Sequence, residues 1–333
     1  MVKFKTSLWG KLMLASIVIY CISLTLLETL VIMFHLDFVS KFILTQNGDG
    51  ISESDLIYHA IFIASLVFQV ILCLDALIQK NSIQLKALLA FNILSLVYAA
   101  LQIQQHITLE EEGTSEATFS PDDITKFPTP EFTKQYYIKK MRPIEYIIAG
   151  LVLGYSVILG LFSYKLMSEF GWENYKIYSG DLQVRNALLS LTLLQALIKL
   201  DVFLILSYAL QLIPSESIGY SDSIFETVSI FIGGFIILFM AWMVKILIPR
   251  TDGIDPYRFT RKLLFFTLST TFVFISITIY YATICFKNMN RGVYVYTAYQ
   301  SSVGPQDEGN RTSKRFSKIS EVSEARKSII ILD

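Results

Sequence analysis

The stretch that decides the fold class is Leu12–Phe34, which reads LMLASIVIYCISLTLLETLVIMF. It is apolar apart from a few hydroxyl-bearing residues and a single carboxyl group, that of Glu28. About 20 consecutive apolar residues are enough for a helix to cross the hydrocarbon core of a membrane. The stretch lacks the alternation that marks a barrel strand, and a backbone in lipid must satisfy its own hydrogen bonds. We therefore predict a transmembrane helix, because the run is too long for a signal-peptide core.

Similar apolar runs recur along the chain and define its organisation. We predict an all-α polytopic membrane protein, a bundle of seven transmembrane helices over residues 1–286, followed by a polar, disordered C-terminal tail over residues 287–333. The predicted spans are 12–34, 57–78, 85–106, 144–166, 188–212, 224–248 and 263–286.

The composition supports a membrane protein. Of the 333 residues, 53% are hydrophobic and 17% are charged, and the mean hydropathy is +0.52. A soluble domain usually has about 25% charged residues. The net charge is zero, so no overall field favours nucleic acid as a partner. The cysteines Cys21, Cys73 and Cys285 all lie in apolar segments, which is typical of buried small side chains and not of a disulfide framework or a zinc site.

The longest loop, 107–143, begins acidic and ends basic, and Pro121, Pro128 and Pro130 predict irregular structure there. The balance of Lys and Arg near the spans slightly favours a cytoplasmic N-terminus. Two features of the tail bear on this orientation in opposite ways. Asn310 begins a glycosylation sequon, which needs a lumenal tail, whereas Ser317 lies in a basic-directed phosphorylation pattern, which needs a cytosolic tail. The orientation stays open.

Ionisable residues inside the spans are costly, so each is a candidate for function. The predicted intramembrane charged network consists of Glu28, Asp75, Lys199 and Asp201. Lys199 and Asp201 lie two residues apart and point to opposite sides of their helix, so we expect Lys199 to pair with Glu28 or Asp75 on another helix. One interpretation is a path for protons or solutes or a lipid-headgroup site, and the other is buried ion pairs that fix helix packing. Cys21, Glu28 and His35 recur every seven residues and are predicted to share one helix face.

Span 144–166 contains a GxxxG pattern at Gly150 and Gly154. Small residues at this spacing let two helices approach closely. The pattern predicts helix packing, either within the chain or between two copies of it in a homodimer.

Motifs of catalysis and cofactor binding were sought, and HExxH, GxSxG, P-loop and GxGxxG patterns do not occur in this sequence. The three histidines, His35, His59 and His106, show no HxxxH spacing. We therefore predict a protein that is not an enzyme, with no cofactor and no metal site.

Between the fourth and fifth spans lies Glu169–Asp181, EFGWENYKIYSGD, which combines acids, aromatic residues and two glycines. Aromatic rings gather at the headgroup level of membranes, and lysines extend toward lipid phosphates. We interpret the stretch as an interfacial connector that binds lipid or a partner protein. Its candidate residues are Glu169, Phe170, Gly171, Trp172, Tyr175, Lys176 and Asp181.

Three stretches carry a family resemblance: DALIQKNSIQL with the later VYAALQIQQ (75–105), EFGW with the following Tyr175-Lys176, and ALIKLDVF (196–203). In these the chain resembles a fungal family of uncharacterised, UPF-type Golgi apparatus multi-span membrane proteins. The resemblance covers the second to fifth spans. The family's second motif ends Gly-Ala-Asp, whereas this chain has Ser-Gly-Asp at 179–181, so the turn is shifted by one residue.

The resemblance implies a Golgi or other endomembrane location and about seven spans, and it implies no biochemical activity. The first functional hypothesis is a non-enzymatic membrane protein that binds membrane lipids or Golgi membrane proteins, and not nucleic acid. The alternative is a transporter or receptor that uses Glu28, Asp75, Lys199 and Asp201. Seven spans alone do not distinguish the two.

Overall fold

The computed structural model describes residues 7–44, 46–108, 110–111, 114, 117–177, 182–211 and 261–288. Its helices are α1 (Leu8–Val39), α2 (Gln46–Gln79), α3 (Ser82–Thr108), α4 (Pro130–Ile177), α5 (Leu182–Gln211) and α9 (Arg261–Asn288). Two short strands, β1 (Phe42–Ile43) and β2 (Thr118–Phe119), pair antiparallel.

The predicted all-α membrane fold is confirmed for the described part of the chain, where six helices are long and apolar enough to cross a membrane. Each of them corresponds to one predicted span, and only residue 212, the last of span 188–212, lies outside the described helix. The remaining predicted span, 224–248, lies outside the described residues, as do Asn310, Ser317 and nearly all of the predicted tail.

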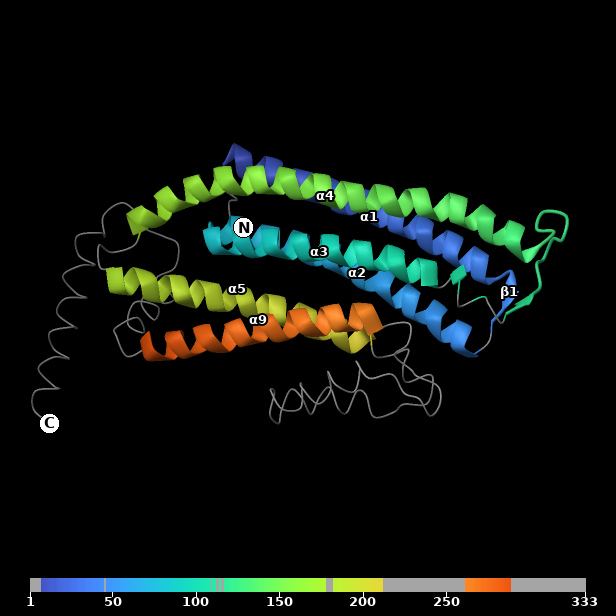
Figure 1. The fold of residues 1–333 in the computed structure, drawn as a ribbon. Helices are drawn as coiled ribbons and strands as arrows, with labels where there is room; N and C mark the ends of the chain where they lie inside the picture. The colour runs from blue at the N-terminus through green and yellow to red at the C-terminus, as the bar shows by residue number, and fades with distance from the viewer. Residues whose placement is uncertain are drawn as a thin grey trace, which may run out of the picture.

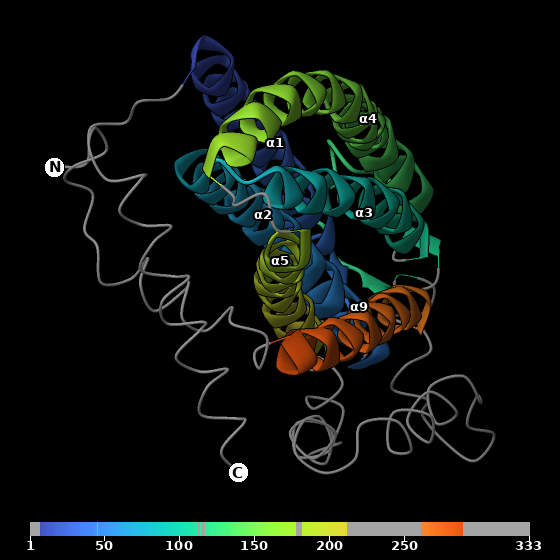
Figure 2. The ribbon, with the colours of Figure 1, turned by 90° about the vertical axis from the view of Figure 1, so that its left-hand side faces the viewer.

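The helices form three stacked pairs, α1 with α4, α2 with α3, and α5 with α9 (Figures 1 and 2). The first four make one antiparallel bundle, and α5 and α9 lie against α2 and α3. On α1 the buried positions recur every three or four residues, as at Met13, Ile17, Tyr20 and Leu24, which is the period of a helix that buries one face. Buried side chains from all six helices join into one large apolar core. A second, smaller cluster near the β1–β2 pair consists of Phe38, Phe42, Tyr137 and Met141.

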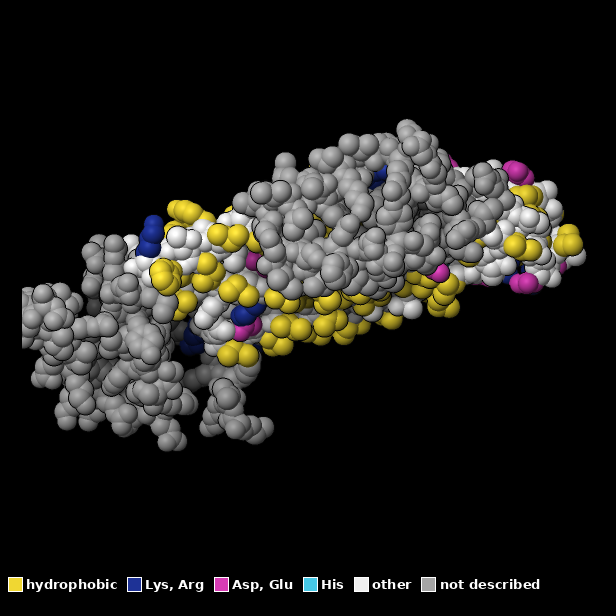
Figure 3. Space-filling view, turned by 90° about the horizontal axis from the view of Figure 1, so that it is seen from below, with side chains coloured by type: hydrophobic (Ala, Val, Ile, Leu, Met, Phe, Trp, Pro, Cys, Tyr) yellow, Lys and Arg dark blue, Asp and Glu magenta, His cyan; other side chains and the backbone are white. Residues whose placement is uncertain are grey.

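The opposite helix faces are apolar as well, because they face lipid. Leu26 on α1, Val157 and Leu161 on α4, and Val202 on α5 are all more than 60% exposed. Figure 3 shows hydrophobic side chains along the flank of the described residues. Since lipid does not penalise exposed apolar surface, such a surface is typical of a membrane protein.

The stretch DALIQKNSIQL, the first of the three that carry the family resemblance, forms the tight turn between α2 and α3. Lys80 has a positive φ of 49°, and the Asn81 amide N–H bonds to the Ala76 carbonyl oxygen at 3.0 Å, which closes α2. The Asn81 side chain accepts a hydrogen bond from the amide of Ile83 at 2.9 Å and caps α3. The two helices can therefore run antiparallel with almost no loop.

The prediction of irregular structure across 107–143 is wrong for its last part, because α4 begins at Pro130. Proline fits the first turn of a helix, where its missing N–H would have no helical partner. Thr129 supplies the cap, since its hydroxyl accepts a hydrogen bond from the amide of Phe132 at 3.2 Å. Pro143, inside α4, does not end the helix.

The β1–β2 pair ties the α1–α2 loop to the α3–α4 loop at one end of the bundle, with Phe42 opposite Phe119. Lys41 strengthens this link through contacts at 2.9 Å with Asp122 and 3.3 Å with Asp37. The ends of α1 and α3 and the starts of α2 and α4 are therefore held together.

Candidate metal centre

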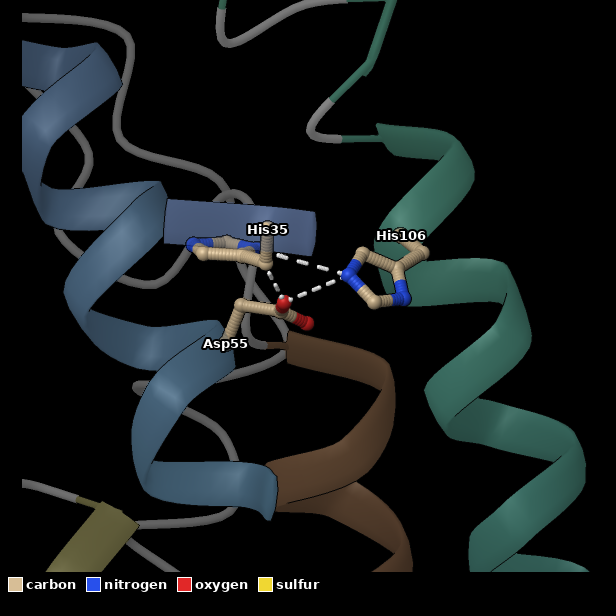
Figure 4. A group of neighbouring side chains, drawn as sticks. All are labelled: His35, Asp55 and His106. Atoms are coloured by element: carbon tan, nitrogen blue, oxygen red, sulfur yellow. Dashed lines mark hydrogen bonds and ion pairs between the residues drawn. The ribbon is translucent and has the colours of Figure 1, made fainter. Parts of the chain in front are cut away.

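Histidine and carboxylate side chains from three helices converge at this end of the bundle. His35 lies near the end of α1, Asp55 near the start of α2, and His106 near the end of α3. In an antiparallel bundle these positions meet at the same membrane interface, although they are far apart in sequence. Figure 4 shows the three side chains pointing toward one another.

Three atoms form a small triangle. Oδ2 of Asp55 lies 2.9 Å from Nδ1 of His35 and 2.9 Å from Nε2 of His106, and the two nitrogens are 3.4 Å apart. All three residues are completely buried. Both imidazole nitrogens lie at ion-pair distance from Oδ2 of Asp55, and they also lie at hydrogen-bond distance from each other. A buried carboxylate is costly unless a positive charge compensates it.

His59 extends the cluster toward the membrane interior. Its Nε2 lies 3.5 Å from Oδ2 of Asp55, one helical turn earlier on α2, and its Nδ1 lies 2.5 Å from Oε2 of Glu28 on α1. The amide of Gln102 on α3 contacts both His59 and Glu28. A small cavity of about 10 Å³ beside the cluster is lined in part by these residues, and it has room for about one water molecule or one ion.

A second layer of polar groups holds the imidazole rings in place. Nε2 of His35 lies 3.0 Å from the hydroxyl of Ser52, and Nδ1 of His106 lies 2.5 Å from Oε1 of Glu145. Arg142 contacts the other oxygen of Glu145 at 3.3 Å and also pairs with Glu110. From the centre of the cluster to its edge, the imidazole of His106 is therefore followed by the carboxylate of Glu145, the guanidinium of Arg142 and the carboxylate of Glu110.

Glu110, at the outer edge of the cluster, lies beyond the membrane-spanning part of α3. Burial raises the pKa of Glu110 to about 7, although the charge of Arg142 opposes this shift. Desolvation disfavours the charged carboxylate more than the guanidinium favours it.

The structure places the predicted charged network in three separate places, so the four residues do not form one network. Glu28 belongs to the histidine cluster and contacts His59. Asp75 pairs with Lys199, which selects one of the two partners expected for that lysine. Asp201 accepts a hydrogen bond from the hydroxyl of Thr278 on α9 at 2.5 Å.

Gly150 and Gly154 lie on an exposed face of α4, and within the described residues no atom comes within 4 Å of a Cβ built at either position. The described helices therefore give no support to packing of these glycines within the chain, and the homodimer stays a prediction.

The stretch Glu169–Asp181 is not a separate short connector, because α4 continues without interruption to Ile177. Phe170, which we expected at headgroup level, is buried in the core, whereas Tyr164 is 70% exposed. Glu169 is half-buried and Gly171 is exposed. Trp172, Tyr175 and Lys176 lie on the last helical turns, and Asp181 is outside the described residues.

The sequence predicted the part of the cluster that lies on α1, but it did not predict that residues of three helices come together. The seven-residue spacing of Cys21, Glu28 and His35 correctly predicts a shared face, and all three are buried. Asp55 and His59, four residues apart on α2, show the same kind of signal, as do Gln102 and His106 on α3. A search for polar residues four apart at the ends of spans would have found these pairs. The prediction of no metal site relied on the absence of HxxxH spacing, which considers only distances along the chain.

Comparison with known proteins gives one fungal relative. The chain is 25% identical over 169 residues to a UPF0658 Golgi apparatus membrane protein of Schizosaccharomyces pombe. The aligned region is 47% of this chain and 48% of the relative, so the chain spans about half the length of the curated relative that it matches. No family model and no solved structure matches.

The chain therefore has a homologue among fungal Golgi apparatus membrane proteins, and the resemblance inferred from the motifs is confirmed. Six helices able to cross a membrane agree with a multi-pass protein of this kind. The relative's description names a location and assigns no biochemical activity.

Proposed function

We propose that the protein is a non-enzymatic, multi-span membrane protein of the Golgi apparatus that binds a cation inside its α1–α4 bundle. The observation that carries this proposal is the buried histidine–carboxylate cluster at one end of the bundle. The proposed location rests on the Golgi relative and on the six membrane-spanning helices.

The charges in the cluster favour a cation. Its mutually contacting groups include the carboxylates of Glu28, Asp55, Glu145 and Glu110, and the guanidinium of Arg142. With neutral imidazoles, the carboxylates of Glu28, Asp55 and Glu145 bring three negative charges against the one positive charge of Arg142, and Glu110 adds a partial charge because its pKa is raised to about 7. Buried charges in a membrane protein need partners, so this deficit is compensated either by protons on the imidazoles or by a bound cation, and we infer the cation.

The transporter hypothesis, which used Glu28, Asp75, Lys199 and Asp201 together, receives less support because the structure separates these residues. A cation carrier that works through the histidine cluster would be a variant of the present proposal. Cation flux in reconstituted vesicles would distinguish a carrier from a binder.

We further propose that the last turns of α4 contact membrane lipids or Golgi membrane proteins. The exposed ring of Tyr164 and the aromatic and basic sequence that follows it favour a position at the headgroup level.

Thermal melting of the full-length protein in detergent tests cation binding. We expect at least one cation of a panel, tested at constant pH, to raise the Tm of the wild type, because a ligand of the folded state stabilises it. Asp55→Asn should remove most of the response. Asp201→Asn, a buried carboxylate outside the cluster, is the matched control and should keep it. A wild-type Tm that responds to none of these cations, or an unchanged response in Asp55→Asn, would refute the proposal.

A further inference from the structure

We propose that the bound cation is a divalent transition-metal ion of the zinc class, held by Nδ1 of His35, Nε2 of His106 and Oδ2 of Asp55. This inference rests on the proposed function and names the ligand of the same site.

The size of the triangle fits such an ion. Zinc binds imidazole nitrogen and carboxylate oxygen at about 2.0–2.2 Å, so two ligand atoms of a tetrahedral site lie about 3.3 Å apart. The three edges of the triangle measure 2.9, 2.9 and 3.4 Å. Displacements of a few tenths of an ångström would bring all three atoms to bonding distance.

The three atoms face one another across a fully buried triangle. The two imidazole nitrogens lie at hydrogen-bond distance from each other, 3.4 Å, and each lies 2.9 Å from Oδ2 of Asp55. Either a proton or a metal ion at the centre compensates the lone pairs of these atoms, and the measurements below distinguish the two.

The donor types select the class of ion. Imidazole suits zinc, copper, iron and nickel, whereas calcium and magnesium prefer sites made of oxygen alone. Two imidazoles and one carboxylate therefore disfavour alkaline-earth ions. His59 supplies a candidate fourth ligand, because its Nε2 is 3.5 Å from Oδ2 of Asp55 and has no hydrogen bond within the described residues.

The second layer has the pattern found around metal sites. A metal-bound histidine usually donates its other ring N–H to a carboxylate or another oxygen, which fixes the ring and increases its basicity. Here Ser52 faces His35 and Glu145 faces His106, in each case at the nitrogen that does not point into the triangle. Glu28 does the same for His59.

Elemental analysis of the full-length protein, purified from membranes in mild detergent without chelator, tests the inference. We expect about one zinc ion per chain in the wild type. The variants His35→Gln, His106→Gln and Asp55→Asn should each lower the zinc content at least about tenfold. Glu145→Gln should lower it less, because Glu145 only positions His106. The control Asp201→Asn should keep the zinc.

Cobalt(II) provides a second measurement that does not require the variants to fold. Stripped wild-type protein reloaded with Co²⁺ should show the strong visible absorption of a tetrahedral site, and zinc should displace it.

Wild-type protein without zinc and without this absorption would overturn the metal inference. If Tm still responds to other cations through Asp55, the proposed cation binding stands. Zinc that persists in all three ligand variants would overturn the assignment of these ligands.

Discussion

At the scale of single residues, the Asp75–Lys199 pair joins α2 to α5. The side chains are 25% and 37% exposed, and Gln79 also donates a hydrogen bond to Asp75. The pair lies between helices that face lipid, where an unpaired charge is costly. The ion pair is one of the contacts that join the α5–α9 pair to the first four helices, together with the packing of Phe203 against Phe68 and Phe91.

Lys199→Met should therefore lower the stability by leaving Asp75 without its cation. Adding Asp75→Asn should restore much of the loss, with a coupling energy of about 1–2 kcal/mol in a double-mutant cycle. Thermal melts of the two single variants and the double variant measure this coupling. Asp201→Asn is the matched control, because Asp201 contacts Thr278 and should not couple to Lys199→Met. Additive effects of Lys199→Met and Asp75→Asn would contradict the ion-pair role.

Glu110 gives a dependence of stability on pH. Burial raises its pKa in the folded protein to about 7, above the ordinary value of 4.5. The folded state therefore binds this proton more tightly than the unfolded state. The resulting stabilisation is complete below the unfolded pKa and disappears as the pH rises through about 7.

We accordingly expect Glu110→Gln to reduce the loss of Tm between about pH 5 and about pH 8, because glutamine has no proton to lose. Melting curves at several pH values measure the slope. Glu131→Gln, at the exposed start of α4, is the control and should keep the wild-type slope. Equal slopes in the wild type and Glu110→Gln would show that another group sets the pH dependence.

At the scale of elements, α4 differs most from its sequence prediction. The predicted span 144–166 is only its middle, since the helix extends from Pro130 to Ile177. Hydropathy marks the part of a helix that lies in lipid, whereas the full length depends on caps and on neighbours outside the membrane. Tyr137 illustrates this, because it packs with Phe38 and donates a hydrogen bond to Asp37, both on α1.

The exposed glycines of α4 lead to a prediction about the homodimer. Gly154→Leu should lower the fraction of homodimer, because a bulky side chain prevents close approach of two copies of α4. Cross-linking in membranes and light scattering in detergent measure the fraction. Gly154→Ala is the matched control, because alanine is small and has open space around its Cβ. It should keep the dimer and, by its higher helix propensity, add up to about 1 kcal/mol of stability. A wild type that is only monomeric would exclude the homodimer.

At the scale of the whole molecule, the arrangement of the helices creates the candidate site. Four antiparallel helices bring two helix ends and two helix starts to one membrane interface, and the β1–β2 pair holds the connecting loops there. A further polar network, in which Asn92 contacts Tyr20, Gln69 and Ser156, links the same four helices nearer the middle of the membrane. The bundle is therefore defined by specific polar contacts as well as by apolar packing, which has little directional preference in lipid.

The sequence by itself determined that this chain is an all-α, multi-span membrane protein, because hydropathy and length decide whether a segment can remain in lipid. It also determined that Cys21, Glu28 and His35 share a face, because helical periodicity is a local property. Only the tertiary structure decided that His35, Asp55 and His106 meet, and that Lys199 pairs with Asp75 and not with Glu28. The periodicity of one helix fixes directions around its own axis, whereas the choice of neighbouring helices and their relative height depends on the packing of the whole bundle.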